Sequence, residues 1–354
     1  MTATGGREHN VNETMDTATE TARAGLDVEL SDIARSLEAA PKIVVATHEN
    51  PDGDAIGSAR AMELILQQLG KDVVVYVPRG VIPREYEEIR PERLVQETPA
   101  DVEERLLLCV DCGNASRLAN PELLRRAATV LNVDHHADNT RYGDQNVIRG
   151  QVACTTQLVW ELAAELGVER TAPIGTAVYI GLVTDTGRFQ YSNTTAAAFS
   201  LAADLASVGV DTHGVFKEVY ERLEWRRLKL LGRGLDKATH HDEGAIVTTY
   251  LTRDDFAEAG ADDDSAEGIV DFLRGVEGTL VALMVRDLAP GAPAARKGSL
   301  RTTHGQVDVS LIARTYGGGG HRQAAGFSTD DDMLSIIERV RASLREQGTG
   351  DAAG

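Results

Sequence analysis

The sequence predicts an α/β protein of two domains: a larger one on a doubly wound, mainly parallel sheet, and a smaller C-terminal α/β domain, joined by a helical linker. Three observations predict this. The chain has 354 residues, enough for two separate cores. In its N-terminal part short apolar runs alternate with amphipathic segments, the order of strands and crossover helices in a parallel sheet. A long charged segment with a modest apolar stripe then precedes a second group of strands and helices.

The first domain is predicted over residues 28–208, after a polar, disordered tail at 1–27. Short apolar runs bounded by turns predict strands, and longer segments of helical period predict helices. The predicted strands lie at 42–48, 72–78, 105–111 and 128–136. The predicted helices lie at 28–40, 55–70, 155–167 and 193–209.

The linker is predicted over residues 209–242, with one long charged helix at 214–238. The second domain, residues 243–346, is within the usual size range of a domain. Its predicted elements are strands at 244–252, 279–288 and 297–303, a glycine-rich segment at 316–327 and a last helix at 332–347. A flexible tail is predicted at 347–354.

The formal net charge of −19, with arginine far outnumbering lysine, predicts an acidic surface. We interpret it as adaptation to a salty cytoplasm, where screening makes repulsion tolerable; an ordinary acidic soluble protein is the alternative. Phosphate recognition is then expected to be local, without a groove for duplex nucleic acid. Since no apolar stretch reaches the length of a membrane span and the N-terminus does not resemble a secretory signal, we expect a cytoplasmic protein.

Metal-competent side chains follow the apolar runs of the first domain. In chain order the clusters are His48, Asp52 and Asp54; Asp111; Asp134, His135 and His136; and Asp185. Functional groups gather at the carboxyl ends of the strands in an open parallel sheet, so we expect four clusters at successive strand ends to meet. Crowded carboxylates repel one another unless a cation compensates them, and nitrogen and oxygen donors suit Mn²⁺ or Mg²⁺. The number of donors predicts two ions bridged by one carboxylate. A single cluster could instead be a capped turn, with Asp54 as the N-cap of the following helix.

Five segments in order resemble motifs of the DHH phosphoesterase family. They are HENPDGDAIGS (48–58), VDCGN (110–114), VDHH (133–136), GLVTDTGRFQYSNTT (181–195) and GGGGHRQAAGF (317–327). The last is similar to the signature of the family's C-terminal substrate domain, DHHA1. Within the family, the likeness is greatest to the small stand-alone nanoRNase and phosphoadenosine-phosphate (pAp) phosphatase type. The resemblance implies a catalytic DHH domain followed by a DHHA1 domain.

The resemblance also implies roles for the clustered residues. One metal would be held by His48, Asp52 and Asp111, and the other by Asp54, Asp111, His135 and Asp185. Asp111 is then the bridge. Asp134 would orient an imidazole by accepting its other N–H, and His136 would face the scissile phosphate or the leaving group. Mn²⁺ is the expected ion, and Mg²⁺ or Co²⁺ would also suit.

Substrate contacts are expected mainly in the second domain. The glycine run would let backbone N–H groups approach a phosphate, and basic or polar neighbours would add contacts. The expected residues are Gly318, Gly319, Gly320, His321, Arg322, Lys297, Ser299 and Arg301. Arg188, near Asp185, could reach a phosphate or pair with an acidic neighbour. Arg322 departs from the family, where a small or apolar residue is common after the histidine, and this puts the substrate preference in doubt.

The resemblance implies a two-metal phosphoesterase that, like a nanoRNase, hydrolyses short single-stranded oligonucleotides. It also implies pAp as a second class of substrate, from which the enzyme would remove phosphate. The alternatives are a phosphodiesterase for cyclic di-AMP or pApA, a RecJ-like single-strand exonuclease, an inorganic pyrophosphatase, and a non-catalytic nucleotide-binding subunit. The retained ligand set argues against the last, and the GGGGH run argues against the pyrophosphatase. A homodimer is compatible with the sequence, which leaves the polarity of attack open.

Overall fold

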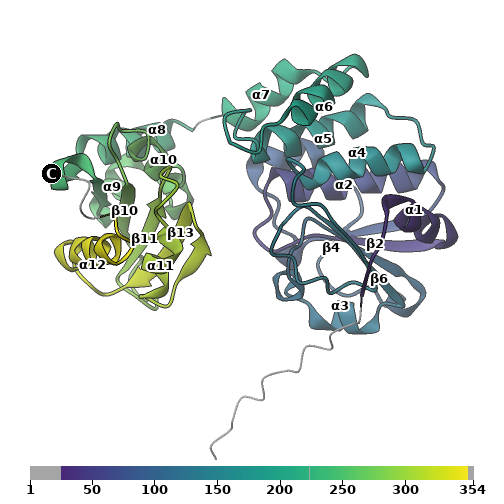
Figure 1. Cartoon of the computed structure of the whole chain (residues 1–354), viewed down its shortest axis with the longest axis horizontal. Coiled ribbons are helices and arrows are strands. Elements are labelled where there is room, and N and C mark those ends of the chain that lie inside the picture. The colour runs from purple at the N-terminus through teal and green to yellow at the C-terminus, as the bar shows by residue number, and fades with distance from the viewer. Residues whose placement is uncertain (1–24, 223, 350–354) are drawn as a thin grey trace, which may run out of the picture. The chain divides into compact units, whose positions relative to one another are not determined.

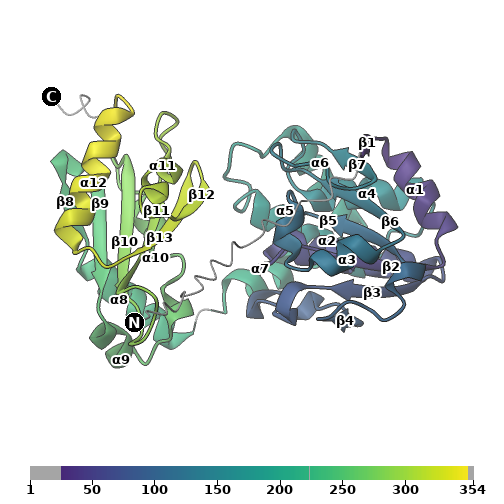
Figure 2. The same cartoon turned by 90° about the horizontal axis from the view of Figure 1, so that it is seen from below.

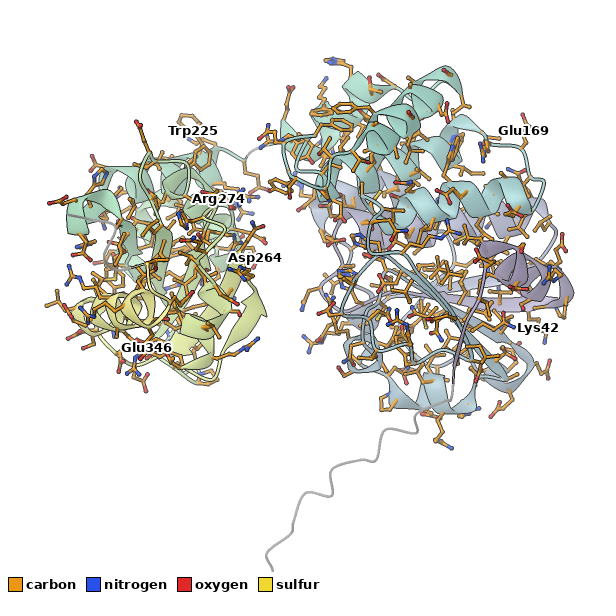
Figure 3. The ribbon with its side chains drawn as sticks, in the orientation of Figure 1. Lys42, Glu169, Trp225, Asp264, Arg274 and Glu346 are labelled. Atoms are coloured by element: carbon orange, nitrogen blue, oxygen red, sulfur yellow. The ribbon has the colours of Figure 1, made fainter. Side chains whose placement is uncertain are left out.

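The computed structural model describes residues 25–222 and 224–349, which form two compact units on either side of residue 223 (Figure 1). Unit 1 precedes this residue and unit 2 follows it. In each unit the side chains fill the space between a central sheet and its helices (Figure 3). No helix within the described ranges combines the length and apolar composition needed to cross a membrane.

Unit 1 is built on a seven-stranded sheet in which every neighbouring pair is parallel, in the order β1-β7-β6-β5-β2-β3-β4. Its strands are β1 (Leu26–Asp27), β2 (Lys42–Ala46), β3 (Asp72–Tyr76), β4 (Leu94–Val95), β5 (Leu106–Val110), β6 (Thr129–Asp134) and β7 (Gln145–Ile148). Its α-helices are α1 (Leu30–Ala39), α2 (Gly53–Gln68), α3 (Pro121–Arg126), α4 (Thr155–Glu165), α5 (Ala172–Asp185), α6 (Ala196–Ser207) and α7 (Thr212–Tyr220). The predicted doubly wound, parallel architecture is confirmed.

Both faces of this sheet are covered, because the strands are apolar on both sides. In β2, Ile43 and Val45 face a large core shared with α1, α2, α4 and α5. Val44 and Ala46, which alternate with them, face a smaller core under α3. Figure 1 shows α3 on the opposite side of the sheet from α2 and α4.

Unit 2 holds a six-stranded mixed sheet in the order β12-β13-β11-β10-β9-β8, in which only β9 and β10 pair in parallel. Its strands are β8 (Thr239–His241), β9 (Ile246–Leu251), β10 (Val281–Asp287), β11 (Arg296–Arg301), β12 (Gly319–His321) and β13 (Ala324–Thr329). Its α-helices are α8 (Trp225–Asp236), α9 (Arg253–Ala259), α10 (Ile269–Leu273), α11 (Val309–Arg314) and α12 (Met333–Glu346). Figure 2 shows β12 and β8 at opposite edges of this sheet. One face packs on α11 and α12, and the other on α8, α9 and α10.

Three sequence predictions of local structure are wrong. The single helix predicted at 214–238 is two helices, α7 in unit 1 and α8 in unit 2. The last residues of the predicted N-terminal tail form β1, because Leu26 and Asp27 pair with β7. The predicted C-terminal tail begins too early: Gln347 accepts a hydrogen bond from the backbone N–H of Asp308, and Thr349 is buried. Residues 1–24 and 350–354 of the two tails lie outside the described residues.

Candidate metal centre

Three of the predicted clusters meet because β6, β5 and β2 are adjacent, parallel strands. His48 follows β2 by two residues, Asp111 follows β5 directly, and Asp134 is the last residue of β6. Carboxyl ends of parallel strands lie at the same edge of a sheet, which brings these side chains together. Asp111 has a left-handed backbone with φ of 52°, a conformation that aspartate adopts more readily than most residues.

The loop after β2 places two aspartates at the start of α2. Asp52 is the N-cap, and its carboxylate accepts hydrogen bonds from the backbone N–H groups of Asp54 (3.1 Å) and Ala55 (3.0 Å). The alternative in which Asp54 caps this helix is therefore wrong. Asp54 is fully buried and accepts instead from the backbone N–H groups of Thr155 (2.6 Å) and Thr156 (2.9 Å), at the N-terminus of α4. The positive end of that helix stabilises the negative charge of Asp54.

Asp185 does not follow a strand, as the four-strand-end prediction required, but is the last residue of α5. The apolar run before it is buried around most of its circumference, a pattern that short apolar strands share. Close packing of α2 on α5 brings Asp54 near Asp185. A Cβ at Gly181 would lie 2.7 Å from Asp54 Oδ1, so only glycine leaves room for this carboxylate.

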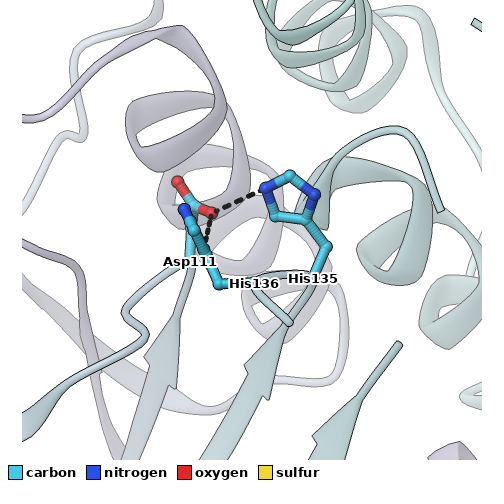
Figure 4. A group of neighbouring side chains, drawn as sticks. All are labelled: Asp111, His135 and His136. Carbon is cyan, nitrogen blue, oxygen red and sulfur yellow. Dashed lines mark ion pairs between the residues drawn. The ribbon is translucent and has the colours of Figure 1, made fainter. Parts of the chain in front are cut away.

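Asp111 lies at the centre of the assembled site. Its Oδ2 is 3.6 Å from His48 Nε2, and its Oδ1 is 3.7 Å from His135 Nε2 and 3.6 Å from His136 Nδ1. Figure 4 shows both histidines of the loop after β6 directed at this carboxylate. His135 Nε2 is also 3.2 Å from Asp185 Oδ2 and 3.9 Å from Asp54 Oδ2.

Three groups of these side chains could each hold a metal ion, since their candidate ligand atoms lie within 4.8 Å of one another. The groups are His48, Asp52 and Asp111; Asp54, His135 and Asp185; and Asp111, His135 and His136. The first matches one predicted ligand set, and the second contains three of the four residues of the other. Asp111 and His135 each belong to two groups, as residues between two ions would.

The pKa values of the buried carboxyl groups also indicate a site that favours bound cations. Burial, and then the charges of neighbouring carboxylates, raise the pKa values of Asp54 and Asp185 well above their usual range. Burial alone would raise the pKa of Asp111 as well, but the contact with His48 and the charges of the histidines hold it below its usual value. Removing the mutual repulsion of these carboxylates requires positive charge, which divalent metals supply.

Hydrogen bonds from Nδ1 orient two of the imidazoles, those of His48 and His136. His48 Nδ1 donates to the backbone carbonyl of Glu49 (2.8 Å), so Nε2 is the ring nitrogen that faces Asp111. His136 Nδ1 donates to Asp134 Oδ1 (2.8 Å). Burial lowers the pKa of His136, but the bond to Asp134 and the nearby carboxylates outweigh it and raise this pKa to about 9. Asp134 therefore accepts a hydrogen bond from an imidazole N–H, and the imidazole is that of His136.

The structure adds three residues that the sequence analysis missed. The Thr155 hydroxyl donates to Asp111 Oδ1 (3.0 Å), and Asn139 Nδ2 donates to Asp134 Oδ2 (2.6 Å). Arg117 Nη2 lies 3.0 Å from His48 Nδ1. Asn139 and Arg117 stand within six residues of a recognised motif, a proximity that could have suggested them. Thr155 is far from any motif before it in the sequence and reaches the site only through the fold.

Arg188 lies near Asp185 in sequence, but its guanidinium stacks over the ring of Tyr220, 5.1 Å from the centroid. Within residues 25–222 and 224–349 no carboxylate forms an ion pair with Arg188, so the acidic partner that the sequence left open is not found there. Gly187, Arg188 and Phe189 all have positive φ, so the chain after Asp185 makes a left-handed turn that is costly for the last two.

The expected substrate residues of unit 2 lie on β11 and on or beside β12, two strands that β13 separates. Along β11 the buried residues Gly298 and Leu300 alternate with Lys297, Ser299 and Arg301. Since Leu300 belongs to the core under α11 and α12, the other three side chains share the opposite face of the strand. Arg301 Nε is 3.3 Å from Asp271 Oδ1.

The glycine run is partly a strand rather than a loop. Gly319–His321 form the edge strand β12, in which Gly319 pairs with Gly326 and His321 with Ala324. Gly320 has φ of 138°, and a Cβ there would lie 2.5 Å from the Ala324 carbonyl. A Cβ at Gly318 would lie 2.3 Å from the Gly326 carbonyl, so both glycines are required by the close hairpin. Arg322 Nη2 donates to the Gly305 carbonyl (2.7 Å).

Comparison of the whole chain with known sequences supports the family resemblance that the motifs indicate. Residues 42–182 match the DHH family, N-terminal domain, and residues 243–346 match the DHHA1 domain. The chain is 36% identical over 315 residues to the bifunctional oligoribonuclease and PAP phosphatase NrnA of Thermus thermophilus, which covers 87% of this chain and 90% of the relative. It is 25% identical over 317 residues to the cyclic-di-AMP phosphodiesterase PdeA of Listeria monocytogenes, covering 84% of this chain and 46% of that one.

Solved structures share the fold. An exopolyphosphatase-related protein from Bacteroides fragilis superposes with a TM-score of 0.82 at 22% identity, over 90% of this chain and 95% of that one. RecJ from Thermus thermophilus, in complex with Mn²⁺, gives a TM-score of 0.52 at 19% identity, over 90% and 55% of the two chains. The motifs, the two domain matches and the 36% identical relative agree, and the chain belongs to the DHH family, with a DHHA1 domain following its DHH domain.

Proposed function

We propose that this protein is a metal-dependent phosphoesterase that hydrolyses short single-stranded oligonucleotides and removes phosphate from pAp. The observation that carries the proposal is the convergence on Asp111 of nitrogen and oxygen donors from strand ends and two helix ends, all in unit 1. The relative from Thermus thermophilus, named as an oligoribonuclease and PAP phosphatase, supports the substrate class.

Two divalent ions would suit the donor set, with Mn²⁺ the best match for carboxylates mixed with imidazoles. We assign the ligands as His48, Asp52 and Asp111 for one ion, and Asp54, Asp111, His135 and Asp185 for the other. When bound, such ions supply Lewis acidity to a phosphoryl oxygen and to the attacking water.

The chain's own residues prepare this chemistry. The α4 N-terminus and the Thr155 hydroxyl hold Asp54 and Asp111 in place, so the ligands need little reorganisation. His136 donates its Nδ1 hydrogen to Asp134, which leaves Nε2 to hold a proton or give it to the leaving oxygen. Because its pKa is raised to about 9, the ring carries that proton at neutral pH before metal binds.

Unit 2 would bind the nucleotide through the polar face of β11 and the backbone of β12, that is, through Lys297, Ser299, Arg301, Gly318, Gly319, Gly320, His321 and Arg322. Arg188 would join these contacts by moving its guanidinium from the Tyr220 ring to a phosphate. The net charge of −19 argues against duplex binding. We further propose a cytoplasmic location and a homodimer.

A timed digestion tests the function. The full-length chain with Mn²⁺ is given an equimolar mixture of end-labelled RNA dimer, five-mer and long single strand, with pAp and cyclic di-AMP in parallel tubes and EDTA as the control. We expect the dimer and five-mer to disappear first and pAp to lose phosphate. Cleavage of cyclic di-AMP alone would favour the second candidate, a cyclic dinucleotide phosphodiesterase, which the similarity to the Listeria enzyme supports. Hydrolysis of none of them would refute the proposal.

A further inference from the structure

The guanidinium of Arg117 lies beside the metal centre without a carboxylate partner. Arg117 follows β5 in the 3₁₀ turn Ala115–Leu118, and its Nη2 is 3.0 Å from His48 Nδ1. It is half-buried, and no ion pair joins it to any carboxylate in residues 25–222 or 224–349. Other arginines of this unit do pair with carboxylates, such as Arg105 with Asp101 and Asp72.

The hydrogen count on His48 leaves this guanidinium without an acceptor. Nδ1 of His48 lies 2.8 Å from the Glu49 carbonyl, which can only accept, so this bond requires a hydrogen on Nδ1. If Nε2 of the neutral ring binds metal, Nδ1 must carry that hydrogen. Arginine can only donate, and a donor facing an N–H makes no hydrogen bond. Arg117 therefore needs another acceptor when the site is loaded.

The backbone holds Arg117 in this place. Its carbonyl accepts a hydrogen bond from the backbone N–H of Glu49 (2.8 Å), which ties the loop after β5 to the loop after β2. A second anchor comes from Asn114, which caps the turn by accepting from the Ser116 N–H (2.9 Å). The guanidinium is thus kept at the rim of a buried anionic cluster although that cluster does not pair with it.

We propose that Arg117 binds the phosphate of the substrate, donating from its guanidinium to a non-bridging oxygen. A guanidinium presents a planar set of donors that matches phosphate oxygens, and an anion that carries its own acceptors satisfies Arg117 as no neighbouring side chain does. This inference rests on the proposed function, since it assumes a phosphate ester at the metal centre. It adds a unit 1 contact to the substrate residues expected in unit 2.

Calorimetry on the full-length, Mn²⁺-loaded chain tests the assignment, with adenosine 5′-monophosphate and adenosine as matched probes. For Arg117→Met we expect the monophosphate to bind at least tenfold more weakly and adenosine to bind within twofold of wild type. Arg117→Lys should lose part of the affinity, because lysine keeps the charge but not the planar fork. Arg125→Met, at an exposed arginine of α3, is the control for lost charge and should change neither.

Two measurements separate the outcomes. If the monophosphate binds equally well to wild type and Arg117→Met, or to neither, the assignment is wrong. It is also wrong if the affinity for Mn²⁺, titrated alone, falls as much as that for the monophosphate, because Arg117 would then act through His48. Should the methionine variant not fold, Arg117→Lys carries the same comparison. Oligonucleotide hydrolysis by wild type with an unaffected Arg117→Met would remove this inference alone, whereas absence of hydrolysis by wild type would remove the proposed function.

Discussion

The metal centre of unit 1 and the basic strand of unit 2 place polar groups in opposite ways. Asp54 and Asp111 are buried, and hydrogen bonds from α4 fix both. Lys297 is exposed on β11, and the half-buried Arg301 meets one half-buried carboxylate, Asp271. Groups fixed before binding act on the reacting atoms, while exposed groups must be ordered by the ligand. Substitutions at the buried metal centre should therefore reduce kcat, and those on the polar face of β11 should raise KM.

Asp111→Asn should have the largest effect. The amide keeps the shape but removes a charge shared by two candidate metal groups, so we expect loss of tight Mn²⁺ binding and at least a thousandfold lower kcat. Metal content after dialysis and the rate of dimer hydrolysis are the measurements. Asp138→Asn, at an exposed carboxylate four residues after Asp134, is the matched control and should behave as wild type. An active, metal-loaded Asp111→Asn would contradict the bridging role.

Thr155→Val comes next, because it keeps the shape of the side chain and deletes only the donor to Asp111 Oδ1. A hydrogen bond to a charged group contributes about 1.5–3 kcal/mol, so kcat should fall roughly 10- to 100-fold. Thr156→Val is the control, since the hydroxyl of Thr156 donates to Cys154 Sγ and its backbone N–H to Asp54 is retained. Equal rates for the two variants would show that the Thr155 hydroxyl does not position the site.

The sequence predicted the strand-end part of this site and missed the helical part. His48, Asp111 and Asp134 follow apolar runs of strand length, and parallel pairing of β2, β5 and β6 then brings them together. Asp185 was placed after a strand because a helix buried on all sides has no polar stripe to reveal its period. Thr155 could not be found, because its contact depends on where α4 begins in space.

Arg301→Met tests the other half of the comparison, the polar face of β11 in unit 2. We expect KM for the RNA dimer to rise about tenfold with kcat nearly unchanged, since the residue would bind substrate and not the reacting atoms. Thermal stability should hardly change, because the surface pair with Asp271 contributes little. Arg314→Met, at an exposed arginine of α11, controls for charge. A fall in kcat at constant KM would place Arg301 in the chemistry and break the division between the units.

The pH dependence of the metal-free protein should also distinguish the buried site. His136 has a folded pKa of about 9, above its ordinary value of about 6.5, so the stability it contributes is present below pH 6.5 and is lost as the pH rises through 9. The raised pKa values of Asp54 and Asp185 act in the same direction. We expect Tm in EDTA to fall by several degrees between pH 6.5 and 8.5, and Mn²⁺ to raise it most at pH 8.5. A Tm independent of pH in EDTA would refute this.

Salt should have the smallest effect and should separate the surface from the site. Exposed charges are screened over about 3 Å at molar salt, whereas the buried contacts around Asp111 are not. If the net charge of −19 is an adaptation to a salty cytoplasm, Tm should keep rising as KCl goes from 0.1 to 2 M. For an ordinary acidic protein, Tm should level off near physiological salt. In either case the affinity for Mn²⁺ should depend on KCl less than KM for the RNA dimer does. The reverse order would mean that the metal centre is open to solvent ions and that the contrast between the two units is wrong.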